Sequence, residues 1–425
     1  MLKIYSKSNV KEFYNILKNR IDEKFDEALK TAAEIINDVK NNGDKAVKYY
    51  TKKFDGVDLD DFYMTDGEIN DIYNQCDGNL IKIMEKAAQN IEEYHKKQVQ
   101  NSYVITKDGI IMGQRVLPIE RVAMHVPGFS AALASTVLMN VIPAKIAGVK
   151  EMIVLTPPNI KGMNPQTIAA AKICGVDKII KVGGAQAVAA AAYGTETIQK
   201  ADKIIGPGII YVAAAKKLVY GAVDIDMIAG PSEILIIADK KANPKYIAAD
   251  LMSQAEHDIL ASSILVTDSE ELIKQVNIEI EKQIKNLSRK EIIKPSLTEY
   301  GGCILCENIE EAIEIANDIA PEHLELAVEN CFDKLDLIKN AGSIFLGDYS
   351  PEPLGDYFAG TNHVLPTNGT ARFSSPLGVD SFVKKSSFIY YSKEKLEEAG
   401  EDIIKFAESE KLTAHANSIK VRLDK

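Results

Sequence analysis

Gln254 and His257 are the side chains whose types and spacing bear most directly on chemistry, in the stretch Asp250-Leu-Met-Ser-Gln-Ala-Glu-His257. Asn243 and Pro244 precede this stretch and form a good N-cap and first turn, so it is predicted to be helical. At 3.6 residues per turn, Gln254 falls on the apolar face and His257 lies at its edge. An amide and an imidazole three residues apart can converge on one metal ion. The alternative is a pair of hydrogen-bonded core residues.

Four polar residues later in the chain extend this chemistry. With the local pair, Asp356 and His415 would supply two imidazoles, one carboxylate and one amide oxygen. Nitrogen and oxygen ligands without thiolate suit Zn²⁺ or a similar first-row metal. Glu322 and His323 follow a proline that is predicted to end or bend a helix, and on a turn both can point into a cleft. A carboxylate beside an imidazole can activate water and move protons.

Composition describes an ordinary globular enzyme-sized chain. A chain of 425 residues is too long to fold around a single hydrophobic core, so more than one domain is expected. A net charge of −11 argues against broad nucleic-acid binding. No N-terminal apolar run occurs, so we expect a cytoplasmic protein with no membrane contact. The pair Cys303 and Cys306 lies in strand-like sequence and is interpreted as core. No G-x-G-x-x-G, P-loop or G-x-S-x-G motif occurs.

The elements that must position these residues follow a βαβ pattern. Residues 1 to about 100 are predicted to be helical, and period-two, β-branched sequence covers 102–126. Predicted strands then lie at 152–156, 178–182, 203–205, 234–238, 263–266, 302–305 and 343–346. Predicted helices between them lie at about 131–147, 165–174, 186–193, 269–287 and from 309. This alternation predicts an α/β fold with two incomplete Rossmann-like parallel-sheet modules and helices on both faces.

Four domains are predicted from this layout. They are an N-terminal helical extension (1–20), a large α/β domain with the zinc and catalytic residues (21–123 with 234–376), a nucleotide-side α/β domain (124–233) and a C-terminal tail (377–425). Residues 348–380 are rich in Gly, Pro, Asn and Ser. A loop this long inside a compact protein is usually functional or disordered, and its His, Asp and aromatic residues favour function.

Several motifs in fixed order resemble the histidinol dehydrogenase family, and the resemblance covers essentially the whole chain. They are Asp250-Leu-Met-Ser-Gln-Ala-Glu-His257, Ala320-Pro-Glu-His-Leu-Glu-Leu326, Gly355-Asp-Tyr357, Gly360-Thr-Asn-His-Val-Leu-Pro-Thr367, Leu412-Thr-Ala-His-Ala416, Gly183-Gly-Ala-Gln-Ala187 and Ala229-Gly-Pro-Ser-Glu233. The resemblance implies a zinc-dependent, NAD-linked oxidoreductase of histidine biosynthesis. Such an enzyme oxidises L-histidinol to L-histidine through the aldehyde, in two successive hydride transfers.

The resemblance also assigns roles to residues of this chain. His323 would take the hydroxyl proton, and Glu322 would activate the water that hydrates the aldehyde. The implied ligands of one zinc ion per subunit are Gln254, His257, Asp356 and His415. The implied substrate contacts are Ser232, Gln254, His257, His323, Asp356, His363, Glu410 and His415. An intertwined homodimer is implied, in which Glu410 and His415 reach the site of the other subunit.

Three positions match the nucleotide contacts of the family, and two of them depart from its usual residues. His125 stands where the family usually carries Tyr, and Ile209 stands where it usually carries Asn, whereas Gln186 is kept. Ile209 has no hydrogen-bonding side chain, so a change in NAD affinity or pose is expected here.

Three alternatives remain open on the sequence. A paralogous zinc and NAD enzyme of the same superfamily would act on another alcohol, such as a sulfonated diol, since a few pocket contacts decide specificity. A zinc hydrolase would use Glu322 to activate a metal-bound water. A protein with a purely structural zinc is disfavoured, because such sites are usually closed and rich in cysteine.

Overall fold

The computed structural model describes residues 2–6, 9–20, 22–128 and 133–424. The chain forms two compact units. The first unit holds the residues up to Gln98 together with Ile119–Phe382, and the second holds Val99–Pro118 together with the residues from Val383 on. None of the described helices combines the length and the apolar character needed to cross a membrane.

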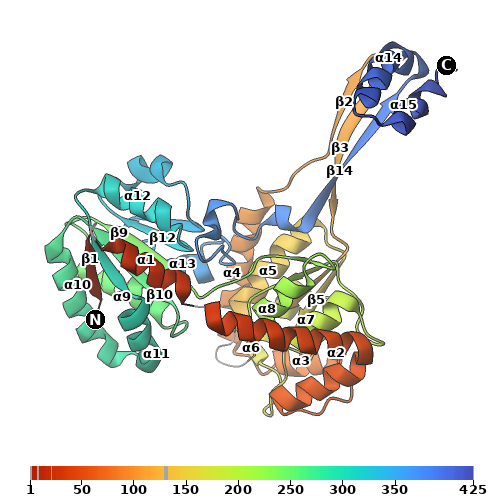
Figure 1. The fold of residues 1–425 in the computed structure, drawn as a ribbon. Coiled ribbons are helices and arrows are strands. Elements are labelled where there is room, and N and C mark those ends of the chain that lie inside the picture. The colour runs from red at the N-terminus through yellow and green to blue at the C-terminus, as the bar shows by residue number, and fades with distance from the viewer. Residues whose placement is uncertain (1, 7–8, 21, 129–132, 425) are drawn as a thin grey trace. The chain divides into compact units, whose positions relative to one another are not determined.

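A six-stranded parallel sheet forms one half of the first unit (Figure 1). Its strands, in spatial order, are β1 (Lys3–Ser6), β11 (Gly302–Leu305), β10 (Ser262–Thr267), β9 (Glu233–Ala238), β12 (His323–Ala327) and β13 (Ser343–Leu346). One hydrophobic cluster joins the sheet to α9 (Pro244–Ala255), α10 (Glu270–Gln283) and α11 (Lys290–Pro295). Another joins it to α1 (Val10–Asn19) and α12 (Ile309–Ile319). The central strands are therefore apolar on both faces, as parallel sheets require.

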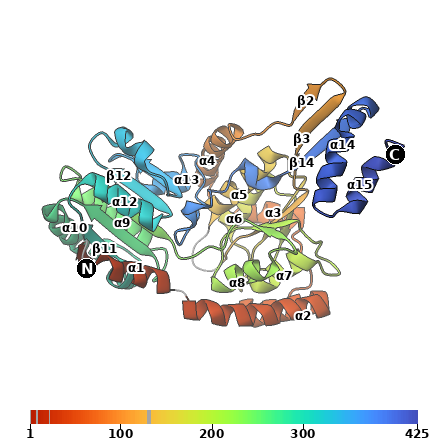
Figure 2. The same cartoon turned by 45° about the horizontal axis from the view of Figure 1, so that its top comes forward.

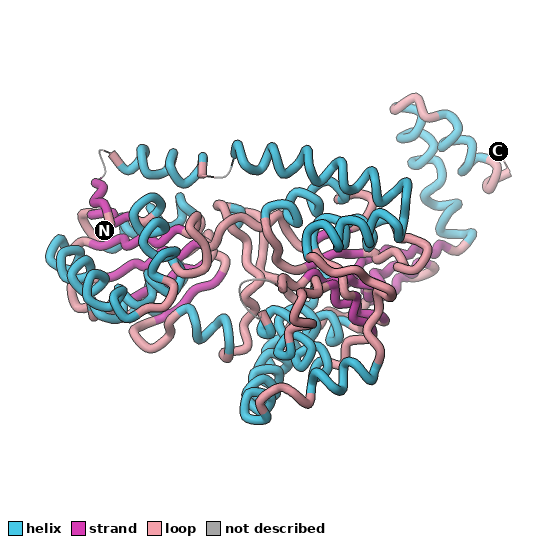
Figure 3. Tube along the Cα trace, turned by 90° about the horizontal axis from the view of Figure 1, so that it is seen from below, coloured by secondary structure: helices cyan, strands magenta, loops and turns pink. Residues whose placement is uncertain are grey.

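A five-stranded parallel sheet forms the other half. Its strands, in spatial order, are β6 (Lys178–Ile180), β5 (Glu151–Leu155), β4 (Arg121–His125), β7 (Lys203–Ile205) and β8 (Asp224–Ile225). On one face pack α2 (Asp22–Asp55), α7 (Gly184–Tyr193) and α8 (Ile210–Val219). On the other pack α3 (Asp66–Tyr73), α4 (Gly78–Lys96), α5 (Ala134–Ala147) and α6 (Pro165–Cys174). Figure 2 shows α2 lying along α7 and α8, and Figure 3 shows the strands of the sheets enclosed by helices.

The second unit is a three-stranded antiparallel sheet with two helices. Its strands, in spatial order, are β14 (Val383–Tyr391), β3 (Ile110–Pro118) and β2 (Tyr103–Lys107). Helices α14 (Lys393–Ser409) and α15 (Thr413–Lys420) pack against each other. Gly400 of α14 allows the segment that follows α15 to lie close against it, because a Cβ at that position would clash with a methyl carbon of Leu423.

The predicted fold class is confirmed: two parallel-sheet modules are covered by helices on both faces. Helix α2 is kinked at Gly43, which has a φ of 51°. Residues 131 and 132, the first of the predicted helix 131–147, lie outside the described residues. The four-domain division stays a prediction.

Several elements differ from the prediction. The turn expected at Glu322-His323 leads directly into β12, and a short helix, α13 (Glu352–Tyr357), interrupts the loop expected at 348–380. His95 is fully buried, although it sits among lysines and glutamates in the sequence, a pattern typical of a solvated helix face. The ring nitrogens Nδ1 and Nε2 of His95 lie 2.7 Å from Gln98 Oε1 and 3.4 Å from Asn362 Nδ2, so both buried nitrogens have a polar partner.

Candidate active site

A cavity of about 180 Å³ in the first unit, here called the site cavity, gathers most of the predicted site residues. It lies where β9 and β12 begin and just beyond the end of β7. It therefore faces the carboxyl edge of one sheet, where ligands of open α/β sheets usually bind, and the amino edge of the other. The predicted residues that line it are Ser232, Gln254, His257, Glu322, His323, Asp356 and His363.

The pair predicted to transfer protons, Glu322 and His323, lies at the start of β12. Glu322 and His323 are buried, and His323 pairs in register with Ile234 of β9 and Ser343 of β13. The Glu322 carboxylate accepts a hydrogen bond from the backbone N–H of Glu233 at 2.8 Å. The Nδ1–H of His323 donates to the carbonyl oxygen of the same residue at 2.9 Å. This second bond leaves Nε2 as the ring nitrogen available to the site cavity.

The charges around this pair shift both titrations. Burial raises the pKa of Glu322 to about 7, although the charge of His323 opposes the rise. Burial alone would lower the pKa of His323, but the charges of Glu322 and Asp356 outweigh it and raise that pKa to about 10. The Nε2 atom of His323 lies 3.7 Å from an Asp356 carboxylate oxygen. Two titratable groups whose pKa values are moved in a shared cavity are typical of acid–base chemistry.

Gln254 is buried with both polar atoms of its side-chain amide lacking a hydrogen-bond partner among the described residues. It lies at the end of α9 with no exposed surface. A hydrogen-bonded core role would need such a partner, since an orphaned buried polar group costs about 1–3 kcal/mol. The next turn brings His257, whose backbone N–H donates to the Gln254 carbonyl at 3.2 Å. The amide therefore faces a gap that a ligand or metal would fill.

A carboxylate that the sequence did not single out completes this part of the site. Ligand atoms of His257, Glu352 and Asp356 lie within 4.8 Å of one another. Both carboxylates come from α13, one helical turn apart, so they share one face. Burial raises the pKa of Glu352 to about 8, whereas hydrogen bonding to His323 and the charge of His363 keep the pKa of Asp356 below its usual value despite burial. If the helix α13 had been predicted from the sequence, the one-turn spacing between Glu352 and Asp356 would have pointed to Glu352.

Two predicted residues lie outside this unit. His415 is on α15, and Glu410 is the residue at which α14 ends. Both belong to the second unit. Their roles as metal ligand and substrate contact stay predictions.

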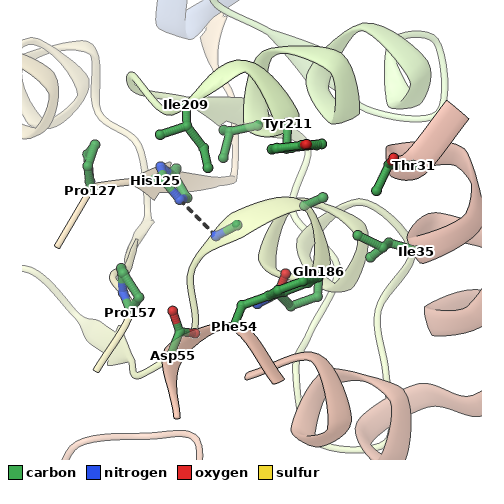
Figure 4. Close-up of a pocket in the computed structure, with 13 residues that line it drawn as sticks. Thr31, Ile35, Phe54, Asp55, His125, Pro127, Pro157, Gln186, Ile209 and Tyr211 are labelled. Carbon is green, nitrogen blue, oxygen red and sulfur yellow. Dashed lines mark hydrogen bonds between the residues drawn. The ribbon is translucent and has the colours of Figure 1, made fainter. Parts of the chain in front are cut away.

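The three predicted nucleotide contacts line a second cavity of about 310 Å³, here called the nucleotide cavity (Figure 4). His125 ends β4, Gln186 is in the first turn of α7, and Ile209 precedes α8. Proline, isoleucine, phenylalanine and tyrosine side chains make the rest of the wall mostly apolar. Flat apolar walls with few polar groups suit a planar heterocycle.

His125 uses both ring nitrogens within the protein. Its Nδ1–H donates to the carbonyl of Pro207 at 2.7 Å, and its Nε2 accepts from the N–H of Gly184 at 3.1 Å, the bond drawn in Figure 4. Burial lowers the pKa of His125 to about 4, which fits this neutral ring. His125 thus links the turn at Gly183-Gly184 to the turn at Gly206-Pro207-Gly208. Both of its ring nitrogens are engaged, so neither is free to bind a ligand. The buried polar atoms without described partners here are Gln186 Oε1 and Asp55 Oδ2.

Fold and site together define an α/β protein in which a buried Glu–His pair shares one cavity with nitrogen- and oxygen-bearing side chains, and a second, mostly apolar cavity lies elsewhere in the same unit. The model of one family, described as histidinol dehydrogenase, matches residues 18–423. The histidinol dehydrogenase of Clostridium acetobutylicum is 60% identical over 413 residues, which cover 97% of this chain and 96% of that protein. That of Lactococcus lactis is 56% identical over 402 residues, covering 94% and 93% of the two chains.

A solved structure is similar over the same span. The crystal structure of histidinol dehydrogenase from Elizabethkingia anophelis has a TM-score of 0.92 and 42% identity, covering all of this chain and 98% of that one. This chain therefore belongs to the histidinol dehydrogenase family, a family of oxidoreductases.

Proposed function

We propose that this enzyme oxidises L-histidinol to L-histidine through L-histidinaldehyde, the last step of histidine biosynthesis, with NAD⁺ as hydride acceptor and one zinc ion per subunit. Family membership supports the overall reaction. The observation that carries the proposal is the site cavity, where Glu322 and His323 lie beside the unpartnered Gln254 amide.

The donor set fits a zinc ion. In the first unit an amide oxygen, an imidazole and a carboxylate are available from Gln254, His257 and Asp356, and none of the described residues that line the cavity is a cysteine. His415 is proposed as the fourth ligand, supplied by the partner subunit. Zinc bound here would hold the amino alcohol by its amino and imidazole nitrogens, and would offset the Asp356 charge that raises the pKa of His323.

His323 serves the first oxidation. Since Nδ1–H is donated to the Glu233 carbonyl, Nε2 of the neutral ring is the atom that accepts the hydroxyl proton, which requires the raised pKa of His323 to fall when the site is loaded. The carbon-bound hydrogen leaves with its electron pair as hydride to NAD⁺, and the alcohol becomes the aldehyde. A positioned base of this kind typically contributes 10²–10⁴-fold to the rate.

Glu322 serves the second oxidation. Its pKa of about 7 means that a large fraction is ionised at neutral pH, so the carboxylate can take a proton from water as the oxygen adds to the aldehyde. His323 then accepts a hydroxyl proton of the hydrate while a second hydride leaves. The balance is one histidinol, two NAD⁺ and one water giving one histidine carboxylate, two NADH and three protons.

The remaining contacts are proposed in the same way. Ser232 and His363 line the site cavity and would contact substrate. His125, Gln186 and Ile209 mark the nucleotide cavity. In the proposed cytoplasmic homodimer, Glu410 and His415 complete the site of the other subunit.

The decisive assay is NADH formation from L-histidinol and NAD⁺ by the purified protein, before and after chelation and zinc re-addition. We expect zinc-restored turnover with two NADH per histidinol. The matched control is His323→Ala, which should keep zinc and lose nearly all turnover. No turnover by wild-type protein that holds stoichiometric zinc would refute the assignment of histidinol as substrate.

A further inference from the structure

The backbone of one residue, Glu233, orients both members of the proton-transfer pair. The N–H of Glu233 binds the Glu322 carboxylate, and the carbonyl oxygen of Glu233 binds Nδ1 of His323, at 2.8 and 2.9 Å. Any shift of this backbone segment would therefore move both side chains together. The position of the Glu233 backbone relative to β12 therefore determines the orientation of both side chains.

The side chain of Glu233 is fixed by a residue more than two hundred positions earlier in the chain. Its carboxylate forms an ion pair with the guanidinium of Arg20, and the exposed fractions of the two side chains are 10% and 0%. The same guanidinium nitrogen donates to Asn368 Oδ1 at 3.0 Å and approaches the Pro231 carbonyl at 3.4 Å. All three contacts are made by Nη2, whereas Nε and Nη1 have no hydrogen-bond partner among the described residues.

Neither member of this ion pair is in position to react. Arg20 and Glu233 are absent from the wall of the site cavity, although the neighbouring Ser232 lines it. A second tie holds the same loop, since the N–H of Gly230 donates to Thr367 Oγ1 at 2.7 Å. The loop 230–233 is therefore anchored on both sides, and the ion pair acts on the site only through the Glu233 backbone.

We propose that Arg20 and Glu233 are positioning residues, whose ion pair fixes the backbone of Glu233 so that Glu322 and His323 present their reactive atoms to the substrate. This proposal rests on the proposed function, because its readout is histidinol oxidation. A misplacement of about 1 Å at reacting groups can cost up to about 10²-fold in rate. All the proposed zinc ligands and most of the proposed substrate contacts, apart from Ser232 and His323, lie on other segments, so zinc content and KM should change much less than kcat.

The test compares Arg20→Met with wild-type enzyme, measuring kcat, the KM for histidinol and zinc content. We expect kcat to fall about ten- to hundredfold, while KM and zinc content stay within about twofold. The matched control is Arg121→Met, which breaks the Arg121–Glu151 ion pair between the starts of β4 and β5, outside both cavities. Its kcat should stay within about twofold of wild type.

Three outcomes would overturn the proposal. The first is a kcat of Arg20→Met within twofold of wild type. The second is a fall in kcat accompanied by an equal-fold rise in KM and an equal-fold loss of bound zinc, and the third is an equal fall in kcat in Arg121→Met. If Arg20→Met does not fold, Arg20→Lys carries the test, because lysine keeps the charge but places its nitrogen one bond short of the Nη2 position that makes the contacts. The same split of kcat from KM is then required.

Failure of the proposed function would look different. Wild-type protein without histidinol turnover would refute that function and leave the positioning role to be judged from a crystal structure of Arg20→Met. There the distance from Glu322 Oε2 to the Glu233 nitrogen should exceed hydrogen-bond range. An unchanged distance of 2.8 Å would refute the positioning role itself.

Discussion

Replacing Gln254 should have opposite effects on the metal-free and the zinc-bound protein. In the absence of metal, its amide is buried without a described partner, which costs about 1–3 kcal/mol for an unsatisfied group. Gln254→Met removes the polar atoms and keeps an unbranched side chain of similar length. The chelated variant should therefore unfold with a free energy about 1–3 kcal/mol higher than chelated wild type.

With zinc the order should reverse. A ligand that binds only the folded state stabilises it by about 4 kcal/mol at a thousandfold excess over its Kd. The variant lacks one proposed ligand, so its Kd rises and its gain from the same zinc concentration shrinks. Urea unfolding followed by circular dichroism, with chelator and with zinc, measures both differences.

The control is a glutamine whose amide is already satisfied. Gln98 Oε1 contacts His95 Nδ1 at 2.7 Å and accepts from the N–H of Val379 at 3.1 Å. Gln98→Met should destabilise the protein with or without zinc, because it orphans those partners. A chelated Gln254→Met protein that is less stable than chelated wild type would refute the reasoning, since the amide would then have a partner that the metal does not supply.

Three further predictions test the division of labour. Glu322→Gln should slow the second oxidation more than the first in single-turnover assays, and equal slowing would contradict the assigned water activation. Randomly mixed His257→Ala and His415→Ala subunits should recover about a quarter of wild-type activity if each site is shared in a symmetric dimer, whereas no recovery would place each site within one chain. Ile209→Asn should lower the KM for NAD⁺. It should also raise the free energy of unfolding by roughly 1 kcal/mol, because Ile209 is the N-cap of α8 and makes no side-chain capping bond. A Tm and a KM that both stay unchanged would contradict this prediction.

The most consequential difference between prediction and structure concerns β12. Pro321 and the polar residues after it favoured a bent helix end, because Glu322, His323 and Glu325 do not read as a buried strand. The strand forms since β9 and β13 supply backbone partners on both sides, and its polar side chains find buried partners of their own. Strand preference depends on such context more than helix preference does.

The sequence by itself determined what depends on local order. The βαβ alternation follows from hydrophobic periodicity and glycine turns, and the pairing of Gln254 with His257 follows from the pitch of one helix. Only the tertiary structure decided which distant groups meet: Glu352 beside His257, and Arg20 against Glu233. The physical reason is that burial and ion pairing arise between segments far apart in the chain, and no local spacing encodes which of the many polar residues will share one cavity.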